Sequence, residues 1–379
     1  MTGTFAAVGF VVTIIVVILI HEAGHFVMAR KFDIKVEEYF VGFGPRLWST
    51  RRGETEYGVK AIPLGGYVKI AGMNPFVEPA EEDLPRTYGA KPIWQRSLVI
   101  LAGPMTHFFL AFIVLVLYLG LVGQPSRYTA FISSVQPTLN GAVSPASAAG
   151  IKPGDVVLSV NGHPADVDNF VNFTRADTNL APLVLVVARD GKEITLSATP
   201  EVATMDGQTR PFLGISLSPG AVLARDRSSF LGSFRDAATV FWRGVSEVFS
   251  SFTRVFGPSG IGRLFSLVFG EAQRSSGDAV SMVGAARIAS QAADAGEFDA
   301  FVALFVSINL FVGLLNLVPL PPFDGGHLAT LAVEKLRHGK KVDMRKMIPI
   351  TAVVAALLIT FMLAVVYLDF AKPVPNLFP

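Results

Sequence analysis

Cysteine is absent from the 379-residue sequence. This absence excludes disulfide frameworks and any zinc or redox site built on thiolates, so a metal would have to be held by His, Asp or Glu. Charge is also scarce, because only 16% of the residues are Asp, Glu, Lys or Arg, whereas about 25% is usual in soluble domains. The net charge of +2 gives no reason to expect a nucleic-acid partner. The scarcity of charge instead predicts contact with a lipid bilayer.

Long apolar runs are abundant, since hydrophobic residues make up 51% of the chain. Four stretches approach the roughly 20 residues that a membrane-spanning helix requires. We expect spans at residues 5–29, 98–122, 301–318 and 348–368. The first run could be a secretory signal peptide, but it lacks a basic start and leads into His21 and Glu22 instead of a small-residue cleavage site. This pattern favours a retained span.

Lys and Arg gather in two of the connections between these spans. The first connection contains Arg30, Lys31, Lys35, Arg46, Arg51, Arg52, Lys60 and Lys69, and the second contains Lys335, Arg337, Lys340, Lys341, Arg345 and Lys346. Basic connections remain in the cytoplasm. We therefore predict a multi-pass protein of the inner (cytoplasmic) membrane. Both termini and the long region between the second and third spans should be extracytoplasmic.

The first connection, residues 31–96, is rich in β-forming residues between positions 36 and 70, interrupted by glycines. This composition predicts short antiparallel strands at the cytoplasmic membrane face. A basic loop lying on anionic lipid is the alternative.

The extracytoplasmic region contains a predicted soluble domain at residues 128–220, followed by an amphipathic helix at 228–256. We expect this helix to lie along the outer membrane surface, and residues 257–300 to form a connection of small and polar residues. The order of turns in the domain resembles that of a bacterial PDZ domain, through Ser144-Pro145-Ala146, Ala149-Gly150-Ile151, Pro153-Gly154-Asp155 and Val160-Asn161-Gly162. In PDZ domains a hydrophobic-Gly-hydrophobic loop binds peptides. The matching residues here are Phe212, Leu213, Gly214 and Ile215, which could equally be a strand end with a turn glycine.

The first span contains the HExxH pattern, from His21 and Glu22 to His25. On a helix, two His four residues apart share one face and can bind one Zn²⁺, while the adjacent Glu can reach a water on the metal. Ionisable groups inside a membrane span are costly and usually mark function. Histidines that cap a helix end at the interface are the alternative interpretation.

A catalytic zinc needs a third protein ligand and one open position. Asp324 is the best candidate, because it follows the cytoplasmic end of the third span, at the same side and similar depth as His21 and His25. The Pro and Gly residues around it break the helix, so its polar backbone groups should line protein or water. A simple turn after a membrane helix is the alternative.

These two motifs, His21 to Arg30 and Asn316 to Gly326, resemble those of the site-2 protease family of intramembrane metalloproteases. The similarity is greatest to single-PDZ actinobacterial members, which act in transmembrane signalling. It implies an α-helical membrane protein with four transmembrane helices, a membrane-associated β-segment on the cytoplasmic side and an inserted extracytoplasmic PDZ domain of α+β type. Phe323 and His107 depart from the family pattern, where Leu and often Asn stand. We expect His107 to be a polar group between helices and not a fourth ligand.

The resulting order of segments is 1–30 (first span with HExxH), 31–96 (β-segment and loop), 97–122 (second span), 128–220 (PDZ), 228–256 (amphipathic helix), 257–300 (connection), 301–326 (third span with the Asp-Gly motif) and 348–368 (fourth span).

The resemblance further implies a zinc metalloprotease with one Zn²⁺ per chain, held by His21, His25 and Asp324. Glu22 would act as the catalytic base, and Asn316 would hold the substrate backbone or stabilise the oxyanion. Other divalent metals also suit two His and a carboxylate.

The implied substrates are single-span membrane proteins such as anti-sigma factors, already cut by a separate protease; residual signal peptides are the alternative. An unwound substrate would pair as a strand with Gly65, Gly66, Tyr67 and Val68. The PDZ domain would exclude uncut proteins, by binding peptide or by blocking access.

Two other functions remain possible. A membrane scaffold that works through its PDZ domain would be indifferent to the substitution Glu22→Gln. A transporter could use intramembrane His and Asp for an ion path, but four spans without a detectable repeat weigh against it.

Overall fold

A computed structural model describes residues 2–74, 76–176, 180–205, 208–275 and 277–376. The chain forms two compact units. The first combines Met1–Leu117 with Phe234–Pro379, and the second is Tyr118–Ser233. Each unit is described by itself below.

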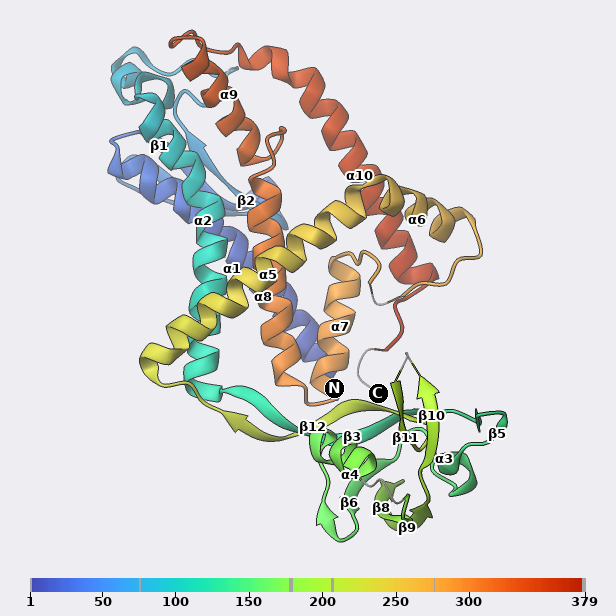
Figure 1. Ribbon diagram of the computed structural model, residues 1–379. Coiled ribbons are helices and arrows are strands. Elements are labelled where there is room, and N and C mark those ends of the chain that lie inside the picture. The colour runs from blue at the N-terminus through green and yellow to red at the C-terminus, as the bar shows by residue number, and fades with distance from the viewer. Residues whose placement is uncertain (1, 75, 177–179, 206–207, 276, 377–379) are drawn as a thin grey trace. The chain divides into compact units, whose positions relative to one another are not determined.

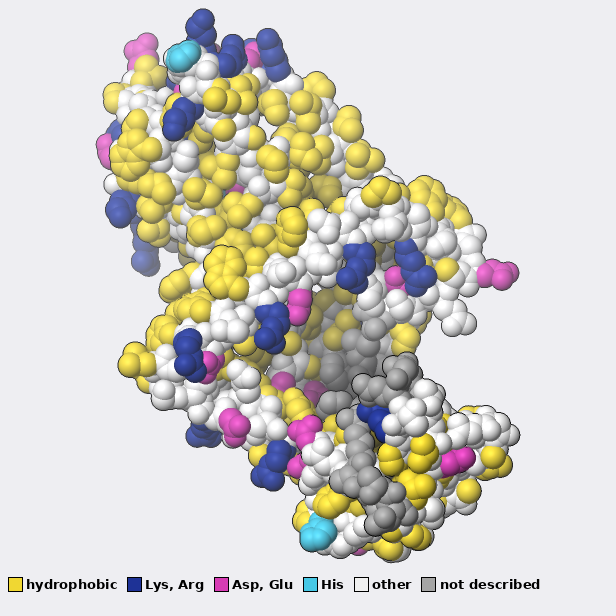
Figure 2. All heavy atoms as spheres, in the orientation of Figure 1, with side chains coloured by type: hydrophobic (Ala, Val, Ile, Leu, Met, Phe, Trp, Pro, Cys, Tyr) yellow, Lys and Arg dark blue, Asp and Glu magenta, His cyan; other side chains and the backbone are white. Residues whose placement is uncertain are grey.

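The first unit is built on helices of membrane-spanning length (Figure 1). Within the described residues, four helical segments are long and apolar enough to cross a bilayer: Phe5–Lys31, Ile93–Val122, Phe298–Asn316 and Arg345–Ala371. They correspond to α1 (Thr2–Lys31), α2 (Ile93–Leu117) with the π-helical turn Tyr118–Val122, α8 (Phe298–Asn316), and α10 (Ile348–Ala371) with the short helix Met344–Met347 before it. The prediction of four helices long and apolar enough to span a membrane is therefore confirmed. Figure 2 shows hydrophobic side chains over the outer face of this unit and Lys and Arg where α9 (Asp324–Leu336) joins α10.

Helices α1, α2 and α8 pack side by side (Figure 1). Gly24 on α1 permits a close approach to α2, because a Cβ atom at this position would lie 2.5 Å from the carbonyl oxygen of Ala102. Helix α9 packs on α2 through Arg96 and Glu334. The apolar spans thus form a bundle around a small number of buried polar groups.

The β-segment between α1 and α2 consists of β1 (Val36–Arg52) and β2 (Thr55–Ile70), which pair antiparallel. Both strands bend, so the start of β1 has partners on two sides: Tyr39, for example, pairs with Tyr57 and also with Val68. In the described pairings, Gly66 to Ile70 pair only with this first part of β1 and form an edge of the sheet. Short 3₁₀ helices at Glu81–Arg86 and Tyr88–Ala90 then lead to α2.

Helix α5 (Phe230–Phe256) crosses the spans, with Phe241 against Phe108 of α2 and Phe256 against Phe361 of α10. The connection that follows contains α6 (Pro258–Phe269) and α7 (Met282–Asp294), which its small, polar composition did not predict. Helix α7 lies on α1, with small side chains buried at Ala285, Ala289 and Ala292. Arg274 and Asp369 form a buried ion pair of 2.7 Å that ties this region to α10.

The second unit contains a sheet in the order β12-β3-β6-β8-β9, with β7 beside β6. The strands are β3 (Gln124–Val135), β6 (Val156–Val160), β7 (His163–Pro164), β8 (Leu183–Arg189), β9 (Lys192–Ala198) and β12 (Ile215–Asp226). Helices α3 (Pro145–Ala148) and α4 (Val167–Ala176) and the pairs β4 (Thr138–Leu139) with β5 (Ala142–Val143) and β10 (Glu201–Met205) with β11 (Gln208–Phe212) complete it. Its core is a continuous cluster that includes Ile132, Val157, Phe170 and Leu185.

Candidate active site

Three potential metal ligands converge where α1 meets the start of α9. His21 and His25 lie one turn apart on α1, and their Nε2 atoms are 3.2 Å from each other. The Oδ2 atom of Asp324 is 3.2 Å from Nε2 of His21 and 3.3 Å from Nε2 of His25. Each residue offers one ligand atom, and all three atoms lie within 4.8 Å of one another. The structure therefore brings together the three residues that the two motifs singled out.

The segment before Asp324 explains how its carboxylate reaches α1. Prolines at 319, 321 and 322 end the helical path of α8, and α9 begins at Asp324 itself. Close packing requires glycine at positions 325 and 326. A Cβ atom on Gly325 would lie 2.3 Å from the carbonyl oxygen of Val318, and one on Gly326 would lie 2.6 Å from the backbone nitrogen of Pro321. The carboxylate is also placed in the first turn of α9, where the helix dipole favours a negative charge.

Hydrogen bonds orient the two histidine rings. Nδ1 of His25 lies 2.8 Å from the carbonyl oxygen of Val99 on α2, so this nitrogen donates and Nε2 keeps its lone pair. Nδ1 of His21 lies 3.1 Å from Nε2 of His107, and Nδ1 of His107 lies 3.2 Å from Oδ1 of Asn309. Both imidazoles thus point Nε2 toward Asp324, as metal-binding histidines do.

Two residues at this site were missed in the sequence. A Cβ atom at Gly103 would lie 2.2 Å from Nε2 of His25 and 2.9 Å from Cε1 of His21, so the absence of a side chain leaves room for both rings. Asn309 is fully buried on α8. The available signal was an amide in the middle of a largely apolar span, because such groups are expensive in lipid unless they have a partner.

The donor set fits a divalent metal. The Oδ2 atom of Asp324 is buried and receives no hydrogen bond in the described part of the chain, although two histidine nitrogens face it. A cation between the three atoms would satisfy this oxygen. Two imidazoles and a carboxylate are typical of catalytic zinc, which keeps a fourth position open.

Glu22 is half-buried beside these ligands and borders the edge of the β-sheet. A Cβ atom on Gly66 would lie 3.5 Å from Cγ of Glu22. Tyr39 donates to the carbonyl oxygen of Leu19 on α1 at 2.7 Å, and burial together with the charge of Glu22 raises the pKa of Tyr39 to about 12. Tyr39 is therefore a neutral donor at physiological pH, and it fixes the sheet to the helix that carries Glu22.

The other predicted site residues lie elsewhere. Asn316 ends α8 and is half-buried. Within the residues that the structure describes, no hydrogen bond or ion pair joins it to His21, His25 or Asp324. In the second unit, Leu213 is buried and Gly214 has a φ of +81°. The carbonyl oxygens of Leu213 and Gly214 accept bonds of 2.8 Å from the backbone nitrogens of Ala146 and Gln136. Ile215 begins β12, which is the outermost strand in the described sheet order.

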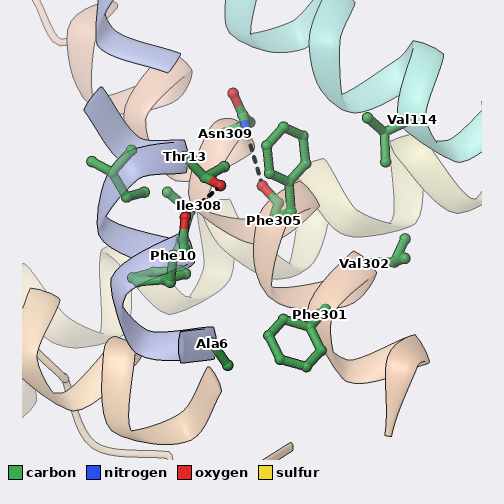
Figure 3. A pocket seen from close by; sticks show the side chains of 11 residues that line it. Ala6, Phe10, Thr13, Val114, Phe301, Val302, Phe305, Ile308 and Asn309 are labelled. Carbon is green, nitrogen blue, oxygen red and sulfur yellow. Dashed lines mark hydrogen bonds between the residues drawn. The ribbon is translucent and has the colours of Figure 1, made fainter. Parts of the chain in front are cut away.

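A cavity of about 560 Å³ lies between α1, α2 and α8 (Figure 3). Its lining is mainly apolar, with Phe10, Val114 and Phe301 among the side chains drawn. Asn309 also lines it, so this amide separates the cavity from His107. The cavity is apart from the three potential metal ligands, which are not in its lining.

Comparison with known proteins identifies the family. The profile of peptidase family M50 matches residues 9–361. The zinc metalloprotease Rip1 of Mycobacterium bovis (strain BCG / Pasteur 1173P2) is 34% identical, over 96% of this chain and 97% of the relative. Rip1 of Mycolicibacterium smegmatis is 33% identical, and the zinc metalloprotease RasP of Geobacillus kaustophilus is 28% identical, each with the same coverage. The chain therefore belongs to peptidase family M50, the site-2 protease family of zinc metalloproteases.

Proposed function

We propose that this metalloprotease hydrolyses peptide bonds within transmembrane segments of single-span membrane proteins, such as anti-sigma factors, after a separate protease has made a first cut. The observation that carries this proposal is the location of the ligand set. His21 and His25 belong to a helix of membrane-spanning length, and Asp324 follows another such helix by a short, proline-rich turn. A peptide bond cut here would lie within or at the edge of the membrane.

We assign His21, His25 and Asp324 as the ligands of one Zn²⁺. When bound, zinc supplies a Lewis acid and lowers the pKa of a water at its open position toward ~7. Glu22 is the adjacent carboxylate, and its role is to accept the proton of the attacking water and return it to the leaving amine. Asn316, at the end of α8, is proposed to hold the substrate backbone or stabilise the oxyanion.

A transmembrane helix hides its peptide bonds in its own hydrogen bonds, so the substrate must unwind before it is cut. The edge of the β-sheet at Gly65, Gly66, Tyr67 and Val68 is proposed to pair with the unwound chain as an added strand. The position of Gly66 against Glu22 supports this assignment. Helix-breaking residues in the substrate should then favour cleavage.

The second unit is proposed to be an extracytoplasmic PDZ domain, residues 128–220, that excludes substrates not yet trimmed. Support comes from its outer strand β12, which begins directly after Leu213 and Gly214. By the basic-connection rule, both termini lie on the same side of the inner membrane as this domain, and the active site lies toward the cytoplasm.

The test uses purified wild type and Glu22→Gln in detergent, incubated with a tagged single-span helix that contains a central Gly or Pro. We expect cleavage by wild type only, abolished by a zinc chelator and restored by added Zn²⁺. Equal cleavage by both proteins would refute the role of Glu22. Cleavage that survives complete removal of the metal would refute the metalloprotease mechanism at this site.

A second comparison tests the proposed exclusion of uncut substrates. The same helix is offered with and without a large folded extracytoplasmic domain. Faster cleavage of the trimmed substrate by wild type, and loss of this preference when residues 128–220 are deleted, would support the gate. An unchanged preference after deletion would contradict it.

A further inference from the structure

A continuous chain of hydrogen bonds leads away from the ligand His21 and crosses three helices. Nδ1 of His21 on α1 meets Nε2 of His107 on α2 at 3.1 Å, and Nδ1 of His107 meets Oδ1 of Asn309 on α8 at 3.2 Å. Nδ2 of Asn309 donates to the carbonyl oxygen of Phe305 at 2.9 Å, one turn back on the same helix (Figure 3). His107 is 2% exposed and Asn309 is 0% exposed.

The geometry admits only one arrangement of protons when His21 binds a metal. Nε2 of His21 faces Asp324 and must keep its lone pair for the metal, so the proton of the neutral ring is on Nδ1. Nε2 of His107 must then accept, which puts the proton of His107 on its own Nδ1. Oδ1 of Asn309 accepts that proton, and its amide nitrogen is left to donate to Phe305. Each of the three bonds therefore joins a donor to an acceptor, and the direction of the two histidine bonds is set from the metal side.

We infer that His107 and Asn309 are positioning residues of the zinc site, which hold His21 in the Nδ1-protonated form with Nε2 directed at the metal. This inference rests on the proposed assignment of His21 as a ligand. Such outer partners of metal-binding histidines fix the ring and raise its basicity, and their loss typically weakens metal binding about 10- to 100-fold.

The alternative, that the two residues only fill space between helices, leaves their chemistry unexplained. A buried amide and imidazole are costly in this apolar region unless they are bonded, and aliphatic residues of similar size would pack α2 against α8 without that cost. The far side of Asn309 lines the apolar cavity between α1, α2 and α8. Its bonds to His107 and Phe305 use the amide oxygen and one of the two N–H groups, and neither bond requires a ligand in the cavity.

Zinc affinity, measured by competition with a chromophoric chelator in detergent, tests the inference directly. The matched pair His107→Leu and His107→Gln fills the same space, but only Gln offers an acceptor near the position of Nε2. We expect His107→Leu to bind zinc about 10- to 100-fold more weakly than wild type, and His107→Gln to recover most of the loss. Excess zinc should restore the proteolytic activity of His107→Leu, which a folding defect would not allow.

Leu115→Ala is the control for lost packing. Leu115 lies on the same helix and is 5% exposed, and its replacement by Ala removes more buried hydrocarbon than His107→Leu does. Its zinc affinity should equal that of wild type; a loss as large as that of His107→Leu would overturn the inference. Equal affinity of His107→Leu and wild type, or equal weakness of the Leu and Gln variants, would overturn it as well.

Asn309→Leu leaves His107 in place and tests the second bond even if His107→Leu does not fold. We expect a smaller loss of zinc affinity than for His107→Leu, and less than additive losses when the two are combined, because both act through one chain. Additive losses would refute the chain of hydrogen bonds.

If wild type itself binds no zinc at this site, the proposed function fails. If wild type binds zinc and cleaves while these variants match it, only the positioning role fails.

Discussion

Arg96 and Glu334 form a buried two-bond ion pair that joins α2 to α9, the helix that begins with the candidate ligand Asp324. The two hydrogen bonds are 2.9 and 2.6 Å, and both side chains are less than 10% exposed. Val99 and His107, which bond the two candidate ligand histidines, lie on the same α2 helix as Arg96. This pair therefore links the helix that orients the histidines to the helix that begins with Asp324.

Removal of one partner of this pair should destabilise the protein strongly. Glu334→Ala leaves the guanidinium of Arg96 buried without a countercharge, at a cost of about 3–5 kcal/mol. Thermal unfolding in detergent should show a lower midpoint, and zinc affinity should fall with it. Glu56→Gln, at the exposed pair with Arg46, is the control and should leave both quantities unchanged. A midpoint for Glu334→Ala equal to that of the control would contradict the structural role.

Gly103→Ala should inactivate the enzyme without unfolding it. The new Cβ atom would have to displace the imidazole of His25, and misplacement of a catalytic group by about 1 Å costs on the order of 100-fold in rate. The measurement is cleavage rate at saturating zinc, with circular dichroism as the check on folding. Gly262→Ala on α6 is the matched control, since nothing lies within 4 Å of a Cβ atom there. Full activity of Gly103→Ala would show that the rings are not held where the structure puts them.

The connection between α6 and α7 should resist proteases as long as Arg274 and Asp369 remain paired. Asp369 also accepts bonds from the backbone nitrogens of Ser281 and Gly284, so Asp369→Ala removes the anchor of α7 on α10. Limited proteolysis should then cut residues 257–300 faster than in wild type. Tyr367→Ala, two residues away and 54% exposed, provides the comparison. Equal rates of cutting in this segment would argue against the anchor.

Acid should loosen the same connection through a second group, Asp278. Hydrogen bonds from Arg263 lower the pKa of this carboxyl to about 2, despite its partial burial. A carboxyl whose pKa is lowered on folding stabilises the protein above its unfolded pKa, near 3.8, and this contribution is lost as the pH falls toward 2. Wild type should lose stability over this range relative to Asp278→Asn, which lacks the group at every pH. Parallel melting curves for the two proteins from pH 5 to pH 2.5 would contradict the assignment.

The parts of this protein that the sequence predicted are those governed by local pattern. Four apolar runs gave the spans, and the spacing of His21 and His25 placed both rings on one helical face. Asp324 was identified because it directly follows the predicted cytoplasmic end of the third span, at the same side and similar depth as His21 and His25. In each case the deciding residues are near neighbours in the chain.

The residues that sequence reasoning missed depend on contacts between helices. The role of Gly103 follows from the distance between α1 and α2, and that of Asn309 from the position of α8, neither of which a pattern of hydrophobicity encodes. Helices α6 and α7 were expected to be a plain connection, because their small and polar residues carry no strong helical signal. A buried ion pair to α10, far along the chain, stabilises them.

The separation of the ligands along the chain also affects biosynthesis. His21 and His25 leave the ribosome with the first helix, whereas Asp324 is made only after the whole of the second unit and α5 to α8. A nascent chain therefore holds two of the three proposed ligands throughout most of translation. On the proposed ligand assignment, the metal site is complete only after Asp324 has been made, so an unfinished chain lacks the third ligand.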